Sequence, residues 1–154
     1  IDFDDKTIGR QRFMADLSPE VFERDIAPAR TFGFMRDVEK LWAAGYALGS
    51  SFENSVVIGD EGVVNEDGLR FSDEFVRHKL LDAIGDLALS TAPLLGSYRS
   101  YRGGHKLNSL VLKALFADES AWSLVEYQPP VSAMGAAPAE RSGEPAIALA
   151  PAKA

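Results

Sequence analysis

The chain has 154 residues, of which 46% are hydrophobic and 25% charged, a balance typical of one modest globular domain. It contains no cysteine, which excludes disulfides, thiolate metal sites and cysteine nucleophiles. The net charge of −7 argues against general nucleic-acid binding, which requires a basic surface. No apolar run approaches the roughly 20 residues that cross a bilayer. The acidic opening IDFDDKTIGR lacks the apolar stretch of a secretory signal and an initiator methionine, so we expect a piece of a longer protein.

The N-terminal third predicts short strands followed by a helix. The segments 1–3 and 12–17 have the composition of short strands. Ser18 is a suitable N-cap, Pro19 suits the first helical position, and Glu20 places an acid in the first turn. A helix is therefore expected to begin at residue 19.

The remaining elements alternate without the regular rhythm of a doubly wound sheet, which favours a layered α+β domain. In chain order they are a short strand or loop at 30–34, a helix at 36–49, a strand–turn–strand at 55–71, a helix at 72–90, a strand at 97–101, a helix at 105–117 and a strand at 122–127.

The last 27 residues differ from the rest, because they hold five of the eight prolines and nine alanines. Such a composition buries too little apolar surface to offset the entropy of ordering. We therefore predict a folded domain at 1–127 and a flexible Ala/Pro-rich tail at 128–154.

One of the two histidines lies in the strongest predicted helix, within FVRHKLLDAIGDL. A helical projection places His78, Lys79, Asp82 and Asp86 within about 100° of one another, opposite the apolar stripe. A histidine and a carboxylate one turn apart can bind a single zinc ion, although a catalytic zinc usually has three protein ligands. The spacing alone favours the alternative, a salt-bridged surface helix.

The second histidine follows two glycines, in YRGGHKLN. Gly103 and Gly104 place His105 at the start of a helix, where backbone N–H groups suit an oxyanion. His105 could act there as a general acid, supported by a carboxylate such as Asp86, or it could be an ordinary loop histidine. From Arg77 to Lys113 the chain also holds six Lys/Arg against two acids, a stretch that could receive an anion or be an ordinary solvated face.

Three segments, ARTFGFMRDVE, NEDGLRFSDEFVRHKLLDAIGDLAL and YRGGHKLN, closely resemble the C-terminal half of the bacterial UDP-3-O-acyl-N-acetylglucosamine deacetylases. These are the zinc amidases of lipid A biosynthesis. The resemblance covers roughly residues 1–127 and implies a two-layer α/β sandwich with an insert that forms a passage for the acyl chain.

The resemblance also implies roles for individual residues. His78 and Asp82 match two of the family's three zinc ligands. Lys79 matches the lysine that meets the substrate's diphosphate and sugar. His105 matches the histidine that stabilises charge and protonates the leaving group, and Asp86 matches the carboxylate that orients it.

Further roles concern the substrate. Thr31 matches a catalytic residue beside the zinc-bound oxygen, and Phe32 a residue beside the hexosamine ring. The segment 34–60 corresponds to the family's acyl-passage insert. Its lining positions hold Val38, Ala47, Phe52 and Val57, for which plain core packing is an equal alternative.

The sequence departs from the family in several places. The third zinc histidine and the general-base glutamate belong to an N-terminal half that this sequence lacks, so the isolated chain is expected to be inactive. Arg102 and Gly103 stand where lysine and serine are common, and Lys106 places a charge near His105 where a small residue is usual.

The resemblance therefore implies zinc-dependent removal of the N-acetyl group from UDP-3-O-acyl-N-acetylglucosamine. We expect a cytoplasmic monomer, peripheral to the inner membrane, whose partners are this substrate and the N-terminal half of the same enzyme. The alternative is a non-catalytic module that binds a UDP-sugar, an acyl chain or a partner.

Overall fold

The computed structural model describes residues 1–127 and 144–150, and their helices and strands confirm the α+β class. The chain divides into two compact units, one of residues 1–83 with 101–103 and the other of residues 84–100 with 104–154. Helix α3 (Glu74–Leu87) is continuous and contributes residues to both units. In the part of the chain that the structure describes, no helix is long and apolar enough to cross a membrane.

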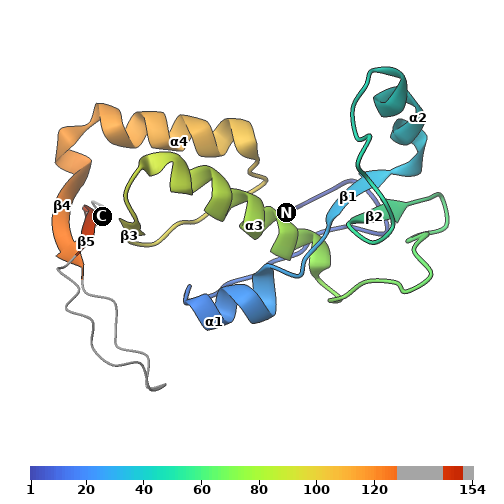
Figure 1. The fold of residues 1–154 in the computed structure, drawn as a ribbon, viewed down its shortest axis with the longest axis horizontal. Helices are drawn as coiled ribbons and strands as arrows, with labels where there is room; N and C mark the ends of the chain where they lie inside the picture. The colour runs from blue at the N-terminus through green and yellow to red at the C-terminus, as the bar shows by residue number, and fades with distance from the viewer. Residues whose placement is uncertain (128–143, 151–154) are drawn as a thin grey trace. The chain divides into compact units, whose positions relative to one another are not determined.

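The first unit contains a strand–helix–strand motif (Figure 1). Strand β1 (Thr31–Phe34) leads directly into helix α2 (Met35–Ala43), and the chain returns to form β2 (Ser55–Ile58) parallel to β1. Parallel pairing requires such a crossover connection. The segment 30–34, expected as a short strand or loop, forms β1, and the helix expected at 36–49 is present but ends at Ala43. The second strand expected after β2 is reduced to one antiparallel bridge between Ile58 and Val63.

The core of this unit lies where β2 meets the first turn of α3. Ile8, Val56, Ile58 and Phe75 are buried together, and Phe32 of β1 packs against them. The apolar side chains of β2 and of the first turn of α3 thus shield one another from water, which holds the start of α3 against the two strands.

The N-terminal strands predicted at 1–3 and 12–17 are wrong, because only an isolated bridge between Asp2 and Arg10 forms. Between them, the Asp5 side chain accepts hydrogen bonds from two backbone N–H groups and makes a tight turn instead. The predicted helix start is confirmed: Ser18 Oγ accepts from the Val21 N–H at 3.2 Å, and α1 (Pro19–Val21) continues as a π-helix over Phe22–Ile26.

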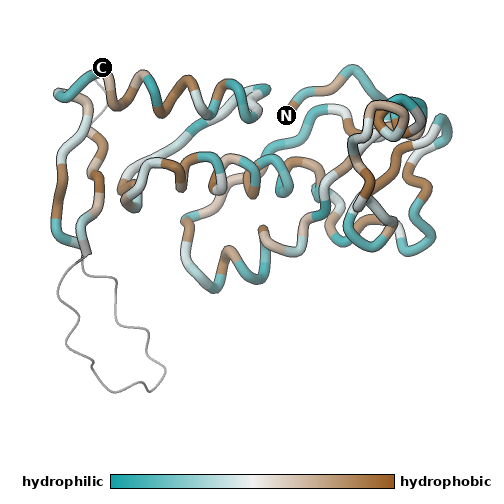
Figure 2. Tube along the Cα trace, turned by 45° about the horizontal axis from the view of Figure 1, so that its top comes forward, coloured by the Kyte–Doolittle hydropathy of each residue, from teal (hydrophilic) through white to brown (hydrophobic). Residues whose placement is uncertain are grey.

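The second unit contains a three-stranded sheet and helix α4 (His105–Ala117). The strands are β3 (Leu94–Leu95), β4 (Trp122–Tyr127) and β5 (Glu144–Leu149), and they lie in the order β3-β5-β4. One 3₁₀ turn follows α3 at Ala88–Ser90, and another precedes β4 at Glu119–Ala121. Figure 2 shows hydrophobic residues recurring along α4, as the predicted helix at 105–117 requires. The strand expected at 97–101 is wrong, and Leu94–Leu95 forms one instead.

Strand β5 also corrects the expectation for the tail. Glu144–Leu149 pairs antiparallel with β4 and parallel with β3, so this part of the segment expected to be flexible is ordered. Its composition is poor in large apolar residues, but backbone pairing on both edges and the burial of Ala146 and Ile147 stabilise it. Residues 128–143 and 151–154 lie outside the described residues, and the domain boundary at 127 stays a prediction.

Candidate active site

The two expected zinc ligands lie together on α3. His78 Nε2 is 3.3 Å from Asp82 Oδ1, and both side chains are mostly buried, at 16% and 15% exposed. Their separation of four residues places them one above the other on the helix. Among residues 1–127 and 144–150 no group of three His, Cys, Asp or Glu could hold a metal ion.

The orientation of the His78 ring fits a metal ligand. Its Nδ1 lies 3.2 Å from the carbonyl oxygen of Ala29. A carbonyl can only accept a hydrogen bond, so this contact assigns a proton to Nδ1 and leaves Nε2, beside Asp82, as the ring nitrogen that can face a metal. Metal-binding histidines are commonly held in this way, with the other ring nitrogen donating to a carbonyl or a carboxylate. The donor pair of imidazole nitrogen and carboxylate oxygen also suits zinc.

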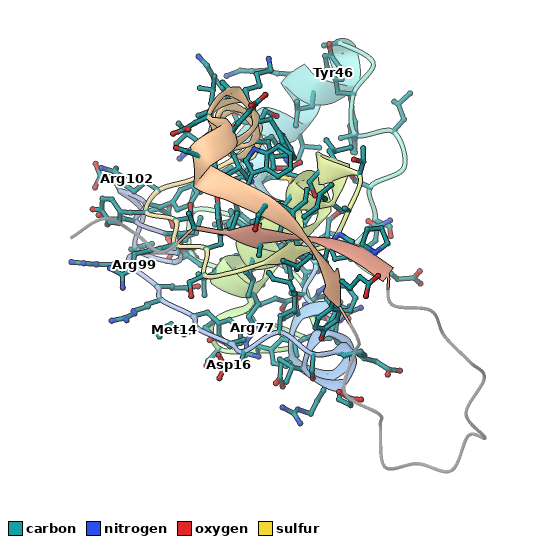
Figure 3. The ribbon with its side chains drawn as sticks, turned by 90° about the vertical axis from the view of Figure 1, so that its left-hand side faces the viewer. Met14, Asp16, Tyr46, Arg77, Arg99 and Arg102 are labelled. Carbon is teal, nitrogen blue, oxygen red and sulfur yellow. The ribbon has the colours of Figure 1, made fainter. Side chains whose placement is uncertain are left out.

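The basic residues next to His78 have defined partners. Lys79 Nζ donates to Asp82 Oδ2 at 2.6 Å, so the lysine expected to meet phosphate lies beside an expected zinc ligand. Arg77, labelled in Figure 3, binds Asp73 at 2.6 Å and stacks 4.3 Å from the ring centroids of Phe13 and Phe71. Arg77 therefore anchors α3. The exposed basic residues of the same stretch are Arg99, Arg102, Lys106 and Lys113.

The second histidine lies in a separate cluster within the second unit. Helix α4 begins at His105, as the two glycines predict, and His105 Nδ1 is 2.8 Å from Asp86 Oδ2. The same carboxylate oxygen accepts a hydrogen bond from Asn108 Nδ2 at 2.8 Å, and Asn108 Oδ1 accepts from the Tyr98 hydroxyl at 2.6 Å. The contact predicted between Asp86 and His105 is thus present, although the predicted catalytic roles of these residues are untested.

The residues expected near the substrate lie at the start of β1. Thr31 is exposed at the start of the strand. Phe32 packs edge-to-face on His78, with ring centroids 6.2 Å apart, and on Phe75 at 5.0 Å. Phe32 therefore limits the position of the imidazole as well as forming part of the core.

The expected acyl-passage positions lie in the insert after β1. Val38 in α2 and Val57 in β2 are half-buried, Phe52 is 52% exposed, and Ala47 is exposed with a left-handed φ of 55°. Neighbouring large apolar side chains are also exposed, among them Tyr46, which is labelled in Figure 3. The full set of large hydrophobic residues exposed in the insert is Met35, Leu41, Trp42, Tyr46, Leu48 and Phe52.

Several buried polar residues escaped the sequence reasoning. Glu74 and Arg30 form an ion pair at 2.9 Å with side chains 0% and 2% exposed. Asn65 binds the backbone of Val57 and Ser55, and Asn108 supports Asp86. None carries a local sequence signal, because each is a common polar residue whose partners lie far along the chain.

Known proteins share most of this sequence. The profile of the family described as LpxC, UDP-3-O-acyl N-acetylglycosamine deacetylase, matches residues 1–117. The chain belongs to this family. Proteins named UDP-3-O-acyl-N-acetylglucosamine deacetylase from Brucella ovis, Brucella canis and Brucella suis are 60% identical to it over 127 residues.

Those 127 residues make up 82% of this chain and 44% of each relative. The chain thus spans less than half the length of the curated relatives that it matches. The family resemblance expected from the sequence motifs is confirmed.

Proposed function

We propose that this chain is the C-terminal part of a zinc-dependent LpxC deacetylase that hydrolyses the N-acetyl group of UDP-3-O-acyl-N-acetylglucosamine in lipid A biosynthesis. The observation that carries the proposal is the His78 ring, whose Nδ1–H is fixed on Ala29 while Nε2 lies 3.3 Å from the Asp82 carboxylate. Family membership and the relatives' names support the same reaction.

His78 and Asp82 would hold zinc together with a histidine from the N-terminal half of the enzyme. When bound, zinc supplies Lewis acidity for the acetamide carbonyl and for the attacking water. A glutamate of the N-terminal half takes a proton from that water as its oxygen bonds to the carbonyl carbon. The carbon–nitrogen bond then breaks, which gives acetate and the free amine of the glucosamine.

His105 would stabilise the developing oxyanion and donate a proton to the leaving nitrogen. Asp86 accepts the Nδ1–H of His105, which leaves Nε2 as the nitrogen directed away from the carboxylate and able to serve the substrate. Thr31 would lie beside the reacting oxygen. We assign Lys79 and the exposed arginines of the stretch 77–113 to the UDP diphosphate, because cations bind phosphate oxygens strongly.

The exposed apolar residues of the insert support binding of the acyl chain. So many large apolar side chains exposed in one short segment favour a binding surface there. We assign the passage for the acyl chain to Val38, Ala47, Phe52 and Val57, and we place Phe32 beside the hexosamine ring of the substrate. We further propose that the reaction takes place in the cytoplasm, at the surface of the inner membrane, and that the enzyme acts as a monomer.

The test uses two variants of the natural full-length chain. His105→Ala should lower turnover by about 10²–10⁴-fold, the usual contribution of general acid catalysis, with zinc content near that of the wild type. Asp82→Ala should lose bound zinc, because a zinc ligand is removed. Full activity in both variants would show that the assignment is wrong.

A second candidate function is a non-catalytic module that binds a UDP-sugar or acyl ligand. Two observations favour it. Within the described residues, α3 offers only two expected zinc ligands, and the chain matches 44% of the length of its relatives. Zinc content and deacetylase activity of the isolated 154-residue chain distinguish the two functions. The incomplete site predicts weak zinc binding and no turnover, and substantial deacetylation by the isolated chain would refute it.

A further inference from the structure

One peptide group contacts the side chains of two residues of α3 that lie one turn apart. The peptide between Ala29 and Arg30 donates its N–H to Glu74 Oε1 at 2.9 Å, and its carbonyl oxygen lies 3.2 Å from His78 Nδ1. Glu74 and His78 are four residues apart and share one face of the helix. The N–H and the C=O of a trans peptide point in opposite directions, so this peptide can bind both side chains at once.

Glu74 is held as a buried carboxylate by several donors. The Arg30 guanidinium binds both of its oxygens, at 2.9 Å and 3.2 Å, and the Arg70 N–H donates to Oε2 at 2.6 Å. Burial acts to raise the pKa of Glu74, but the hydrogen bonds from Arg30 and Arg70 outweigh it and hold the pKa below its ordinary value. The carboxylate therefore stays ionised under the peptide that orients His78.

An ionised acceptor at the N–H end changes the carbonyl end of the same peptide. Hydrogen bonds in a chain polarise one another, so an N–H given to a carboxylate makes its carbonyl a stronger acceptor. Metal-binding histidines that donate to a carboxylate become better oriented and more basic ligands. Here a peptide group stands between the carboxylate and the imidazole and can transmit the same effect.

We propose that Glu74 is a positioning residue for the zinc ligand His78, acting through the Ala29–Arg30 peptide. The inference rests on the proposed function, since it takes His78 as a zinc ligand. Stability alone is a weak explanation for the Arg30–Glu74 pair, because a buried ion pair is often no more stable than apolar residues of similar volume. Arg30 also binds the carbonyls of Phe52 and Gly68, which fixes the peptide from the side of the insert.

The experiment measures zinc affinity in the natural full-length chain by competition with a chelator. Glu74→Gln keeps the shape of the side chain and removes its charge, and we expect a 10–100-fold loss of zinc affinity, the range typical of residues that orient metal ligands. The cobalt-substituted protein should show a changed visible absorption spectrum, because the ligand field of His78 changes. Glu66→Gln, at an exposed glutamate, is the matched control and should change neither property.

A second control separates positioning from general loss of stability. Val56 is fully buried in the same core, and Val56→Ala should lower stability without changing zinc affinity or the cobalt spectrum. An unchanged zinc affinity in Glu74→Gln would overturn the inference, as would an equal loss in Val56→Ala. Absence of zinc binding by the wild-type protein would instead refute the proposed function, and the inference with it.

A measurement without mutation covers the case in which Glu74→Gln does not fold. On addition of zinc to the wild-type protein, the amide proton of Arg30 should shift in the NMR spectrum, because its peptide carbonyl binds the His78 ring. The Arg70 amide, which donates to the other oxygen of Glu74, is the internal reference and should shift less. Equal shifts of the two amides, or none at Arg30, would overturn the inference.

Discussion

Asn108 offers a direct test of the cluster around His105, through Asn108→Ala. Asn108 is only 2% exposed, and its side chain binds Asp86 at 2.8 Å and Tyr98 at 2.6 Å. A hydrogen bond to a charged group contributes about 1.5–3 kcal/mol and a neutral one about 0.5–1.5 kcal/mol. Because Tyr98 is 37% exposed, its hydroxyl can turn to water in the variant and recover part of the loss. We therefore expect the free energy of unfolding to fall by about 2–3 kcal/mol.

The assay is urea denaturation of the natural full-length chain, combined with turnover and zinc content. Tyr98→Phe removes only the neutral hydrogen bond and should cost about 1 kcal/mol or less. Ser109→Ala, at the exposed next position of α4, should change nothing. Turnover should fall in Asn108→Ala because Asp86 loses a donor that fixes the oxygen in contact with His105, while zinc content stays constant. A loss of stability below about 0.5 kcal/mol, or normal turnover in a destabilised protein, would refute the reasoning.

Three further predictions concern other parts of the chain. Because the pKa of Glu74 is lowered in the folded protein, its carboxylate stabilises the fold at pH values above the ordinary pKa of 4.5. This stabilisation is lost as the pH falls through the lower pKa of the folded state. The difference in unfolding free energy between wild type and Glu74→Gln, measured at pH 7, 5 and 3, should therefore shrink in acid, and a constant difference would contradict it. Gly96→Ala would bring a Cβ to 2.6 Å from Leu149 Cδ1, so it should destabilise the β3–β5 pairing by about 1–3 kcal/mol in urea denaturation, whereas an unchanged midpoint would argue against that pairing. Phe52→Ala removes a 52% exposed ring, so it should leave the melting temperature nearly unchanged and raise KM for long-acyl but not short-acyl substrates, and equal effects on both would remove Phe52 from the passage.

Local sequence signals predicted the elements whose causes are local. Ser18 and Pro19 predicted the start of α1, and the glycines before His105 predicted the first residue of α4. The periodicity of residues 72–90 predicted α3 and the shared face of His78 and Asp82. Each of these features depends on residues within a few positions of one another, where the backbone geometry is known in advance.

Features stabilised by distant partners were missed, and β5 is the clearest case. Its six residues, EPAIAL, are too poor in large apolar side chains to predict a strand, yet β3 and β4 supply hydrogen-bonding partners on both edges. The predicted strand at 97–101 failed for the opposite reason. Its aromatic residues favour a strand, but no strand within 1–127 or 144–150 pairs with it, and Tyr98 instead binds the side chain of Asn108.

The same distinction divides the residues expected to do chemistry from those that hold them in place. Helical spacing places His78 and Asp82 on one face of a helix, and the family resemblance makes them the expected zinc ligands. Glu74 contacts the Arg30 peptide across 44 residues, and His78 contacts the Ala29 carbonyl across 49, so no local spacing indicates either contact. Glu74 looks in the sequence like an ordinary acid in the first turn of a helix, where it suits the helix dipole. Its 0% exposure and its hydrogen bonds with Arg30 show that its charge is directed inward, at the peptide that contacts the expected zinc ligand.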